Sequence, residues 1–321
     1  MPTRRTLLAL SALLPGAAHA QGGYPDHPVT VVNPWPAGGS SDSVTRILMQ
    51  RMSADLGQPF VVENRPGATG TLGHAYVARA RPDGHTLLLG TNSTYAIAPH
   101  LNASLPYDND RAFTGISLLA TSPQILCVHP SVPARSLPDF LALAKAQPNA
   151  LSFGTSGIGG TSHLASEMLM AMAGISMLHV PYRGGGPAAQ ALLAGETKVT
   201  FIDLITALPF IANGQVRALG TSTARRAALA PDVPTIAEAG LPGFDSSTDF
   251  AFLAPAGTPA AVVSKLHTAS AAALRAPEVK EKLETAGITI LAEAPDQWPS
   301  YFAREVGKWG AIIKARDIRA P

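Results

Sequence analysis

The sequence contains one cysteine among its 321 residues, Cys127. A single thiol excludes an internal disulfide and any metal site built from several thiolates. Because Cys127 lies in an apolar run, we interpret it as a small buried hydrophobic residue. Charged residues are also scarce, at 14%, and the formal net charge is only +2. The chain has no basic stripe, which argues against a nucleic acid partner.

Long apolar runs are missing as well. After the first twenty residues no segment reaches 18 consecutive apolar residues, about the number that spans a bilayer, so we expect a soluble mature protein. Hydrophobic residues still make up 46% of the chain, and no long polar tract interrupts them. This composition is typical of a globular protein, and the length predicts two domains.

Residues 1–20 are interpreted as a signal peptide. Arg4 and Arg5 precede an apolar run over residues 7–14, and small residues at 18–20 precede Gln21. The apolar run is too short to cross a bilayer, so we predict cleavage after Ala20 and export to the periplasm by the Sec or the twin-arginine route. Loss of Arg4 and Arg5 would leave 22 basic and 22 acidic residues.

Residues 151–164 carry the main functional signal. They read as a short apolar strand, a loop rich in glycine and hydroxyl residues, and the start of a helix. Glycines allow the backbone to approach a ligand closely, and the first N–H groups of a helix have no partner within it. The segment therefore predicts a binding site for an anion.

A matching unit lies near the start of the mature chain. The predicted strand 29–32 runs into the loop 35–42 and then a helix that ends near Gly57, with Ser40, Ser41 and Asp42 as candidate N-caps. Two strand, glycine loop and helix units about a hundred residues apart predict two lobes, each offering a helix N-terminus to one small anion.

The rest of the chain repeats the order of strand, loop and helix, which predicts an α/β fold with a doubly wound, mainly parallel sheet in each lobe. Apolar runs at 116–120 and 124–129 would carry the chain out of the first lobe, and 250–254 would carry it back. We expect lobe 1 at 21–121, lobe 2 at 122–250 and a return with C-terminal helices over 251–321. The ligand cleft is expected at the carboxyl ends of the strands.

Several longer motifs resemble the Bug (TctC-like) periplasmic solute receptors of tripartite tricarboxylate transporters. The similarity extends over the whole mature chain in the same order. The motifs that carry it lie at residues 36–42, 63–67, 82–87, 160–164, 180–185, 232–235, 238–243 and 253–259.

This resemblance implies a Venus flytrap protein of type II-like architecture that binds a small organic carboxylate and delivers it to membrane transporter subunits. The carboxylate would be a di- or tricarboxylate, an acidic amino acid or an aromatic acid. The protein would be a monomer without enzymatic activity, cofactor or metal. The ligand-binding candidates are Trp35, Ala37, Gly38, Gly39, Ser40, Ser41, Asp42, Gly67, Thr91, Ser93, Thr155, Ser156, Gly157, Gly159, Gly160, Thr161, His163, Arg183, Gly184 and Asp203.

Several of these residues have alternative interpretations. Asp42 is either an N-cap or a contact for a cationic group, and Asp203 is either such a contact or a structural hydrogen-bond partner. Arg183 either pairs with a distal carboxylate or is a solvated loop residue. His163 is expected to orient the loop.

Two alternative functions also remain open at the level of the sequence. The chain would then be a receptor for a sensor kinase or a small α/β hydrolase. Ser156 lacks the Gly-x-Ser-x-Gly spacing of a nucleophile elbow. The last glycine of a Rossmann motif is replaced by Ser162, which argues against a nucleotide cofactor.

Overall fold

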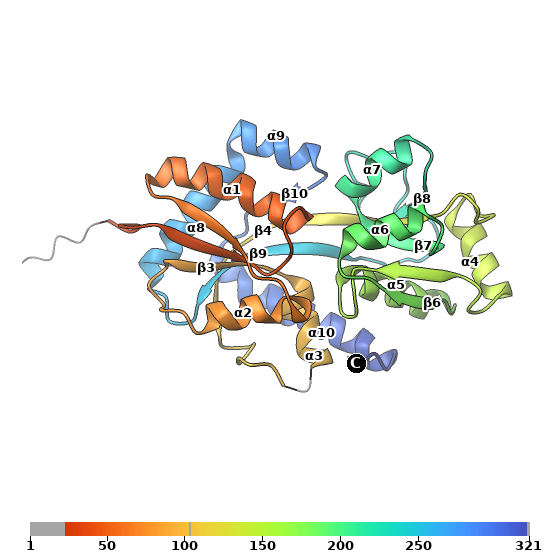
Figure 1. Ribbon diagram of the computed structural model, residues 1–321, viewed down its shortest axis with the longest axis horizontal. Helices are drawn as coiled ribbons and strands as arrows, with labels where there is room; N and C mark the ends of the chain where they lie inside the picture. Colours follow the sequence, from red (N-terminus) through yellow and green to blue (C-terminus); the bar gives the residue numbers. More distant parts are fainter. Residues whose placement is uncertain (1–22, 103, 320–321) are drawn as a thin grey trace, which may run out of the picture.

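The computed structural model describes residues 23–102 and 104–319. The predicted signal peptide lies outside these residues. Figure 1 shows two lobes side by side, with the first and last parts of the chain in one lobe and the middle of the chain in the other. The α/β fold with two lobes that the sequence predicts is confirmed.

Three parallel strands form one side of the first lobe, in the order β2 (Phe60–Asn64), β1 (Val29–Asn33) and β3 (Thr86–Thr91). The apolar side chains of β1 and β3 are buried almost completely, whereas Val61 on the outer strand β2 is exposed. The connections hold α1 (Ser40–Leu56), η1 (Ala68–Gly70), α2 (Thr71–Ala78), η2 (Ser93–Ile97) and α3 (Ala98–Leu101).

Helix α1 corrects one expectation from the sequence. It ends as predicted at Gly57, which adopts φ 68°, but its N-cap is Gly39, and no side chain caps it. Ser40, Ser41 and Asp42 are therefore the first three residues of the helix, and the prediction that one of them is the N-cap was wrong. Their side chains are engaged elsewhere, as described below.

Two long strands connect the lobes. Strand β4 (Phe113–Val128) pairs antiparallel with β9 (Ser247–Pro255) as far as Pro123, and with β7 (Val199–Asp203) from Gln124 onward. The sheet order is β2-β1-β3-β9-β4-β7-β5-β6, where β5 is Ser152–Thr155 and β6 is Leu178–Pro181. Both β8 (Arg217–Thr221) and the short β10 (Thr289–Ile290) also pair with β4. The two apolar runs that we expected at 116–120 and 124–129 are thus parts of one strand shared by both lobes.

The second lobe repeats the arrangement of the first. Strands β7 (Val199–Asp203), β5 (Ser152–Thr155) and β6 (Leu178–Pro181) are parallel, and β8 (Arg217–Thr221) lies antiparallel to β4. The helices are α4 (Leu137–Ala146), α5 (Thr161–Ala173), α6 (Gly185–Leu193) and α7 (Leu204–Ala212). Thr235 and Glu238 form the two reciprocal bonds of a capping box, although the segment they stabilise is a turn.

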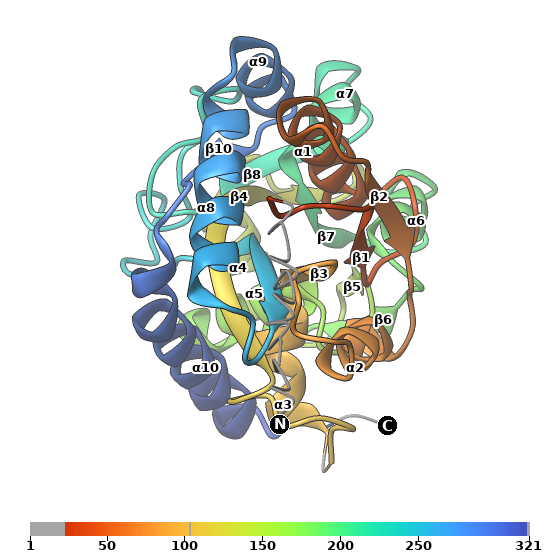
Figure 2. The same ribbon diagram turned by 90° about the vertical axis from the view of Figure 1, so that its left-hand side faces the viewer.

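The chain ends with α8 (Ala260–Arg275), α9 (Pro277–Thr285), η3 (Pro295–Gln297) and α10 (Trp298–Ala315). Figure 2 shows these helices along one side of the first lobe. Leu266 and Leu274 of α8 pack in one core with α1, and the fully buried Trp309 of α10 packs in another with β3 and β9. Among the described residues, no helix combines the length and apolarity required to cross a membrane.

Candidate functional site

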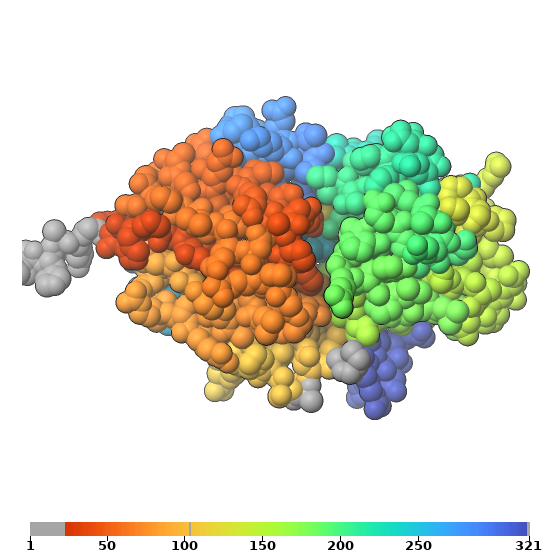
Figure 3. Space-filling model, viewed as in Figure 1, coloured from red at the N-terminus to blue at the C-terminus, as the bar shows by residue number. Residues whose placement is uncertain are grey.

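The two glycine loops lie at the carboxyl ends of β1 and β5, where the lobes face each other. Figure 3 shows a groove between the first lobe and the second. Each loop forms a direct bond to another element of the opposite lobe. Ser40 Oγ donates to Asp203 Oδ2 at 2.8 Å, and Thr69 Oγ1 donates to the carbonyl oxygen of Ile158 at 3.3 Å.

The first glycine loop leaves open space beside the start of α1. A Cβ added to Gly38 or Gly39 would meet no atom within 4 Å. The first intrahelical bond is donated by Ser43 N–H to Gly39 O at 3.0 Å. The N–H groups of Ser40, Ser41 and Asp42 therefore have no acceptor within the helix, and a helix start of this kind attracts anions.

The Asp42 carboxylate fixes the conformation of this loop. Its carboxylate accepts bonds from Gly38 N–H at 3.0 Å, Arg46 Nε at 3.0 Å and Asn64 Nδ2 at 2.9 Å. Burial alone would raise the pKa of the Asp42 carboxyl, but these three bonds outweigh it and hold the pKa below its usual range. All three donors belong to the first lobe, so Asp42 shapes the loop as an anion whose charge is already satisfied.

Other candidates of the first lobe surround the same loop. The indole N–H of Trp35 donates to Thr91 Oγ1 at 3.0 Å, so the ring is oriented by the end of β3. Thr91 and Ser93 are buried, and Ala37 is exposed. Ser41 Oγ donates to Asn33 Oδ1 at 2.7 Å, and Gly67 is the N-cap of η1 with φ 133°.

The second glycine loop is fastened by the helix that follows it. Ser156 N–H donates to Ser162 Oγ at 3.0 Å, and Gly159 N–H donates to His163 Nδ1 at 3.2 Å. His163 is 3% exposed and holds the loop from inside the lobe, which agrees with the expectation that it orients the loop. Gly157 adopts φ 121°, and Gly160 is the N-cap of α5, which starts at Thr161.

Gly159 marks the closest approach of this loop to the first lobe. Its φ is 78°, and a Cβ on it would lie 2.5 Å from Leu101 Cδ1. Glycine suits this backbone conformation, and a larger residue would have to push the end of the Leu101 side chain aside. The second lobe therefore meets the first through main-chain atoms at this point.

Asp203 lies at the centre of the contacts between the lobes. Besides Ser40 it accepts long bonds to Oδ1 from Gln124 Nε2 and Thr248 Oγ1, each at 3.4 Å. Burial raises the pKa of the Asp203 carboxyl, although the three donors oppose the shift. The structure thus supports a hydrogen-bonding role for Asp203, and it places a carboxyl group beside the first glycine loop.

Gln124 of β4 and Thr248 of β9 were not among the candidates from the sequence. Thr248 Oγ1 is 2.9 Å from Thr161 Oγ1, and Gln124 Nε2 is 3.4 Å from the same atom. Gln124 is a polar residue inside the otherwise apolar second half of β4, and Thr248 belongs to the polar start of β9. Polar side chains within or at the start of a buried strand are the signal that could have identified them. They connect Asp203 to the start of α5.

A stack of rings lies behind the second loop. His179 lies between Phe153 and His163, with ring centroids 4.8 and 4.1 Å away. Its Nε2 is 2.6 Å from Thr155 Oγ1. Burial, with a smaller contribution from His163, lowers the pKa of His179 to about 4. At neutral pH this side chain is therefore uncharged.

Arg183 and Gly184 lie in the segment before α6, next to the second loop. Gly184 N–H donates to Ser156 O at 3.2 Å. Arg183 is exposed, and its side chain forms no hydrogen bond or ion pair with any residue that the structure describes. The geometry leaves it available to a ligand or to solvent.

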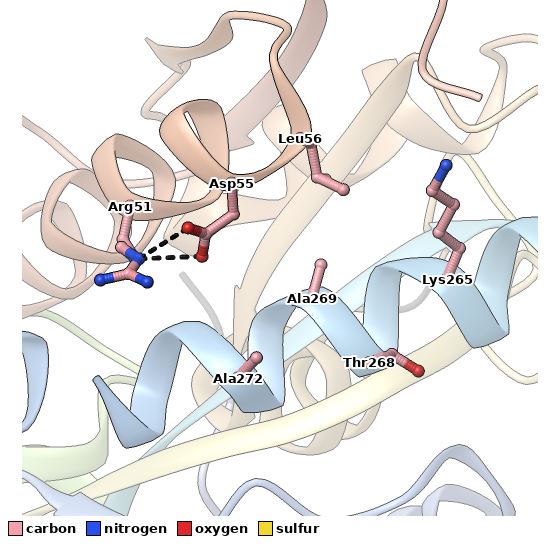
Figure 4. A pocket seen from close by; sticks show the side chains of 7 residues that line it. All are labelled: Arg51, Asp55, Leu56, Lys265, Thr268, Ala269 and Ala272. Atoms are coloured by element: carbon pink, nitrogen blue, oxygen red, sulfur yellow. Dashed lines mark hydrogen bonds and ion pairs between the residues drawn. The ribbon is translucent and has the colours of Figure 1, made fainter. Parts of the chain in front are cut away.

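Two surface hollows lie away from these loops. One, of about 510 Å³, separates α1 from α8, and Figure 4 shows Arg51 and Asp55 paired on α1 across from Ala269 and Ala272. Arg51 also pairs with Glu278, so its charge is neutralised. The other, of about 530 Å³, lies along α10 beside His100. Neither hollow includes a strand end or a glycine loop, so we do not assign the ligand to them.

The chain is similar to known proteins over almost its whole length. A sequence model of the family described as "Tripartite tricarboxylate transporter family receptor" matches residues 44–318. A UPF0065 protein from the tcbD-tcbE intergenic region of Pseudomonas sp. (strain P51) is 38% identical over 99% of this chain and 95% of its own. Protein BugT of Bordetella pertussis is 33% identical over 91% of this chain and 90% of its own.

Solved structures give the same result. Rpa4515 of R. palustris with adipate is 33% identical, with a TM-score of 0.87, and the match covers 92% of this chain and 99% of that one. MatC of Rhodopseudomonas palustris with bound malate is 34% identical, with a TM-score of 0.83, over 90% of this chain and all of that one.

Proposed function

The chain belongs to the receptor family of the tripartite tricarboxylate transporters, the Bug or TctC proteins, and from this membership we propose that it binds a small organic carboxylate between its two lobes. The family consists of periplasmic solute-binding proteins rather than enzymes. Two relatives of the same fold hold dicarboxylates, adipate in one case and malate in the other.

The observation that carries the proposal is the open space beside Gly38 and Gly39 at the start of α1. A Cβ built on either glycine would meet no atom within 4 Å, and the first N–H groups of α1 have no acceptor within the helix. A carboxylate there would accept several N–H bonds from the first lobe. Bonds of this kind favour anions without requiring a positively charged side chain.

The second lobe would complete the site with the loop that follows β5. The candidates Thr155, Ser156, Gly157, Gly159, Gly160 and Thr161 form this loop, and Arg183 with Gly184 lies next to it. A ligand that contacts both loops stabilises the closed arrangement over an open one. A ligand with micromolar affinity requires about 8 kcal/mol in total, which a few charge-assisted bonds and the Trp35 ring can supply.

We further propose how the chain is divided and where it acts. The first lobe would comprise residues 21–121, the second 122–250, and the return segment 251–321. The change of partners along β4 between Pro123 and Gln124 supports the first boundary. Residues 1–20 would direct export, and the mature receptor would deliver its ligand in the periplasm to membrane transporter subunits.

A panel of organic acids tests this function directly. Mature protein is refolded free of ligand, and thermal unfolding is measured with dicarboxylates, tricarboxylates, acidic amino acids and aromatic acids. An acid at about 100 times its Kd stabilises the fold by about 2.7 kcal/mol. A panel in which no acid shifts the melting temperature would overturn the proposal.

A pair of glycine variants then locates the ligand. Gly39 has φ −84°, which any residue adopts, and open space beside it, so Gly39→Leu should fold while it fills the proposed site. Gly307 on the exposed side of α10 also has open space and serves as the control, Gly307→Leu. We expect Gly39→Leu to abolish the thermal shift and Gly307→Leu to retain it. Equal shifts in both variants would place the ligand elsewhere.

A further inference from the structure

Two Asp and His pairs meet at the edge of the first lobe opposite the glycine loops. Asp26 and His27 come just before β1, and Asp83 and His85 come just before β3. The two strands are parallel neighbours, and Thr30 N–H donates to His85 O at 2.9 Å. The pairing of the strands therefore brings together side chains that are almost sixty residues apart in the sequence.

Three potential metal ligands converge at this point. Asp26 Oδ1 lies 2.7 Å from His27 Nδ1 and 3.2 Å from His85 Nε2, and the ligand atoms of these residues are all within 4.8 Å of one another. Zinc bonds of about 2.0–2.2 Å place neighbouring ligand atoms about 3.3 Å apart in a tetrahedral site. We propose that Asp26, His27 and His85 bind a divalent transition-metal ion of the zinc class.

His85 is held in position for this role. Its side chain is 12% exposed, and both ring nitrogens are shielded from solvent without a hydrogen bond of good geometry to any described residue. The Tyr24 ring packs edge-on against it, with centroids 5.1 Å apart. Polar nitrogens in this state gain a partner when an ion binds, because burial has already removed their water.

A carboxylate, that of Asp83, lies near the other ring nitrogen of His85, as is usual for metal-binding histidines. Asp83 Oδ1 lies 3.6 Å from His85 Nδ1 and accepts the His85 backbone N–H at 2.9 Å. A carboxylate behind the ring favours the tautomer with the proton on Nδ1, which leaves Nε2 free to face Asp26 and the ion.

Binding requires one movement. The His27 and His85 rings are stacked 3.6 Å apart with an angle of 7° between their planes. The lone pair of a ring nitrogen lies in the ring plane, so two parallel rings cannot both point at one ion. His27 and Asp26 are 53% and 60% exposed and are free to turn, whereas His85 is confined. The ion would therefore be captured by rotation of His27 out of the stack, and water would take the fourth position.

The donor set decides the class of ion. Two imidazoles and one carboxylate suit zinc, copper or nickel, whereas calcium and magnesium prefer sites built from oxygen ligands alone. The proposed site contains two nitrogen ligands, so Zn²⁺ should bind much more tightly than Ca²⁺ or Mg²⁺.

The experiment uses mature, chelator-treated protein with a purification tag at the C-terminus that contains no histidine. Competition with a chromophoric zinc chelator measures stoichiometry and affinity for the wild type, His27→Ala, His85→Ala and the control His129→Ala. His129 bonds to Ser131 in the second lobe and lies outside the cluster. We expect one Zn²⁺ per wild-type chain, at least tenfold weaker binding in the two cluster variants, and unchanged binding in the control.

His27→Ala keeps this test decisive even if His85→Ala fails to fold, because His27 is exposed and its removal leaves the core intact. Affinity for Zn²⁺ that is the same in His27→Ala as in the wild type would overturn the proposal. The absence of saturable binding at one ion per wild-type chain would overturn it too, and the cluster would then be an ion pair within the protein. A preference for Ca²⁺ over Zn²⁺ would likewise contradict it.

Discussion

Ser40 Oγ donates a hydrogen bond of 2.8 Å to Asp203 Oδ2, although 163 residues separate the two in the sequence. Ser40 is the first residue of α1 in the first lobe, and Asp203 is the last residue of β7 in the second. The bond joins the lobes directly beside the proposed ligand site. It therefore favours the closed arrangement, as a ligand is also proposed to do.

Replacement of Ser40 by Ala should shift ligand-free protein toward an open arrangement. A hydrogen bond to a charged group contributes about 1.5–3 kcal/mol, and its loss removes a contact that exists only when the lobes are close. Small-angle X-ray scattering should show a larger radius of gyration. Ser53→Ala is the control, because Ser53 Oγ bonds to Met49 O and Phe60 N–H within the first lobe. Identical scattering from the two variants would show that the bond has no influence on opening.

Gly159→Ala should weaken ligand binding as well as lower stability, and the loss of stability alone should not account for the weaker binding. A non-glycine residue at φ 78° costs about 1–2 kcal/mol, and the new Cβ would also collide with Leu101. Gly174→Ala has the same kind of backbone strain, at φ 63°, but open space around its Cβ. We expect similar losses in melting temperature for both variants and a raised Kd only for Gly159→Ala. Equal Kd values would contradict a close approach at Gly159.

The Arg316 and Glu167 pair should stabilise the contact of α10 with α5. Arg316 Nε lies 2.8 Å from Glu167 Oε2, and the Glu167 side chain is only 12% exposed. Arg316→Ala removes the ion-pair partner of this carboxylate, which should lower the free energy of unfolding by about 1–3 kcal/mol. Arg319→Ala is the matched control, since its pair with Asp317 is largely exposed and is worth about 0–1 kcal/mol. Urea unfolding measures both variants, and equally small losses in the free energy of unfolding would contradict the prediction.

Stability should fall as the pH decreases from about 6.5 to about 4. In the unfolded chain His179 takes up its proton near pH 6.5, whereas burial delays protonation in the folded protein until about pH 4. The unfolded state thus binds more protons over this range, so the free energy of unfolding rises with pH. The buried His74, whose pKa burial lowers to about 3, acts in the same direction.

His179→Phe should therefore flatten the pH dependence over this window without removing it. Phenylalanine preserves the stack with Phe153 and His163 but has no proton to gain. Urea unfolding at several pH values measures the slope, and His129→Phe in the second lobe provides the control. A slope unchanged by His179→Phe would mean that His179 does not contribute to the pH dependence.

Much of the fold could be predicted from local signals. Helix α4 is defined by local signals, because Ser136 caps it and apolar residues repeat at helical spacing. Gly57 ends α1 in the left-handed conformation, as predicted, and Gly174 ends α5 in the same way. These features depend on residues within one or two turns of each other.

The features that could not be predicted involve partners that are distant in the sequence. The sequence predicts two separate apolar runs at 116–120 and 124–129, but β4 continues between them while it changes from one set of neighbours to another. Gln124 contacts Thr161 and Asp203, which lie 37 and 79 residues away. Nothing in the local pattern gives those partners, and for the same reason the bond from Ser40 to Asp203 could not be predicted.

The continuity of β4 has a consequence for how this protein is dissected. The first part of β4 pairs with β9 and β10, and its last five residues pair with β7 and β8. Neither lobe expressed as a separate fragment would possess all of its own sheet unless the fragment retained the whole of β4. We therefore expect split versions cut within β4, between Pro123 and Gln124, to be recovered as insoluble halves when produced alone. Circular permutants with new termini in an exposed helical turn keep β4 continuous, and we expect them to fold as soluble proteins.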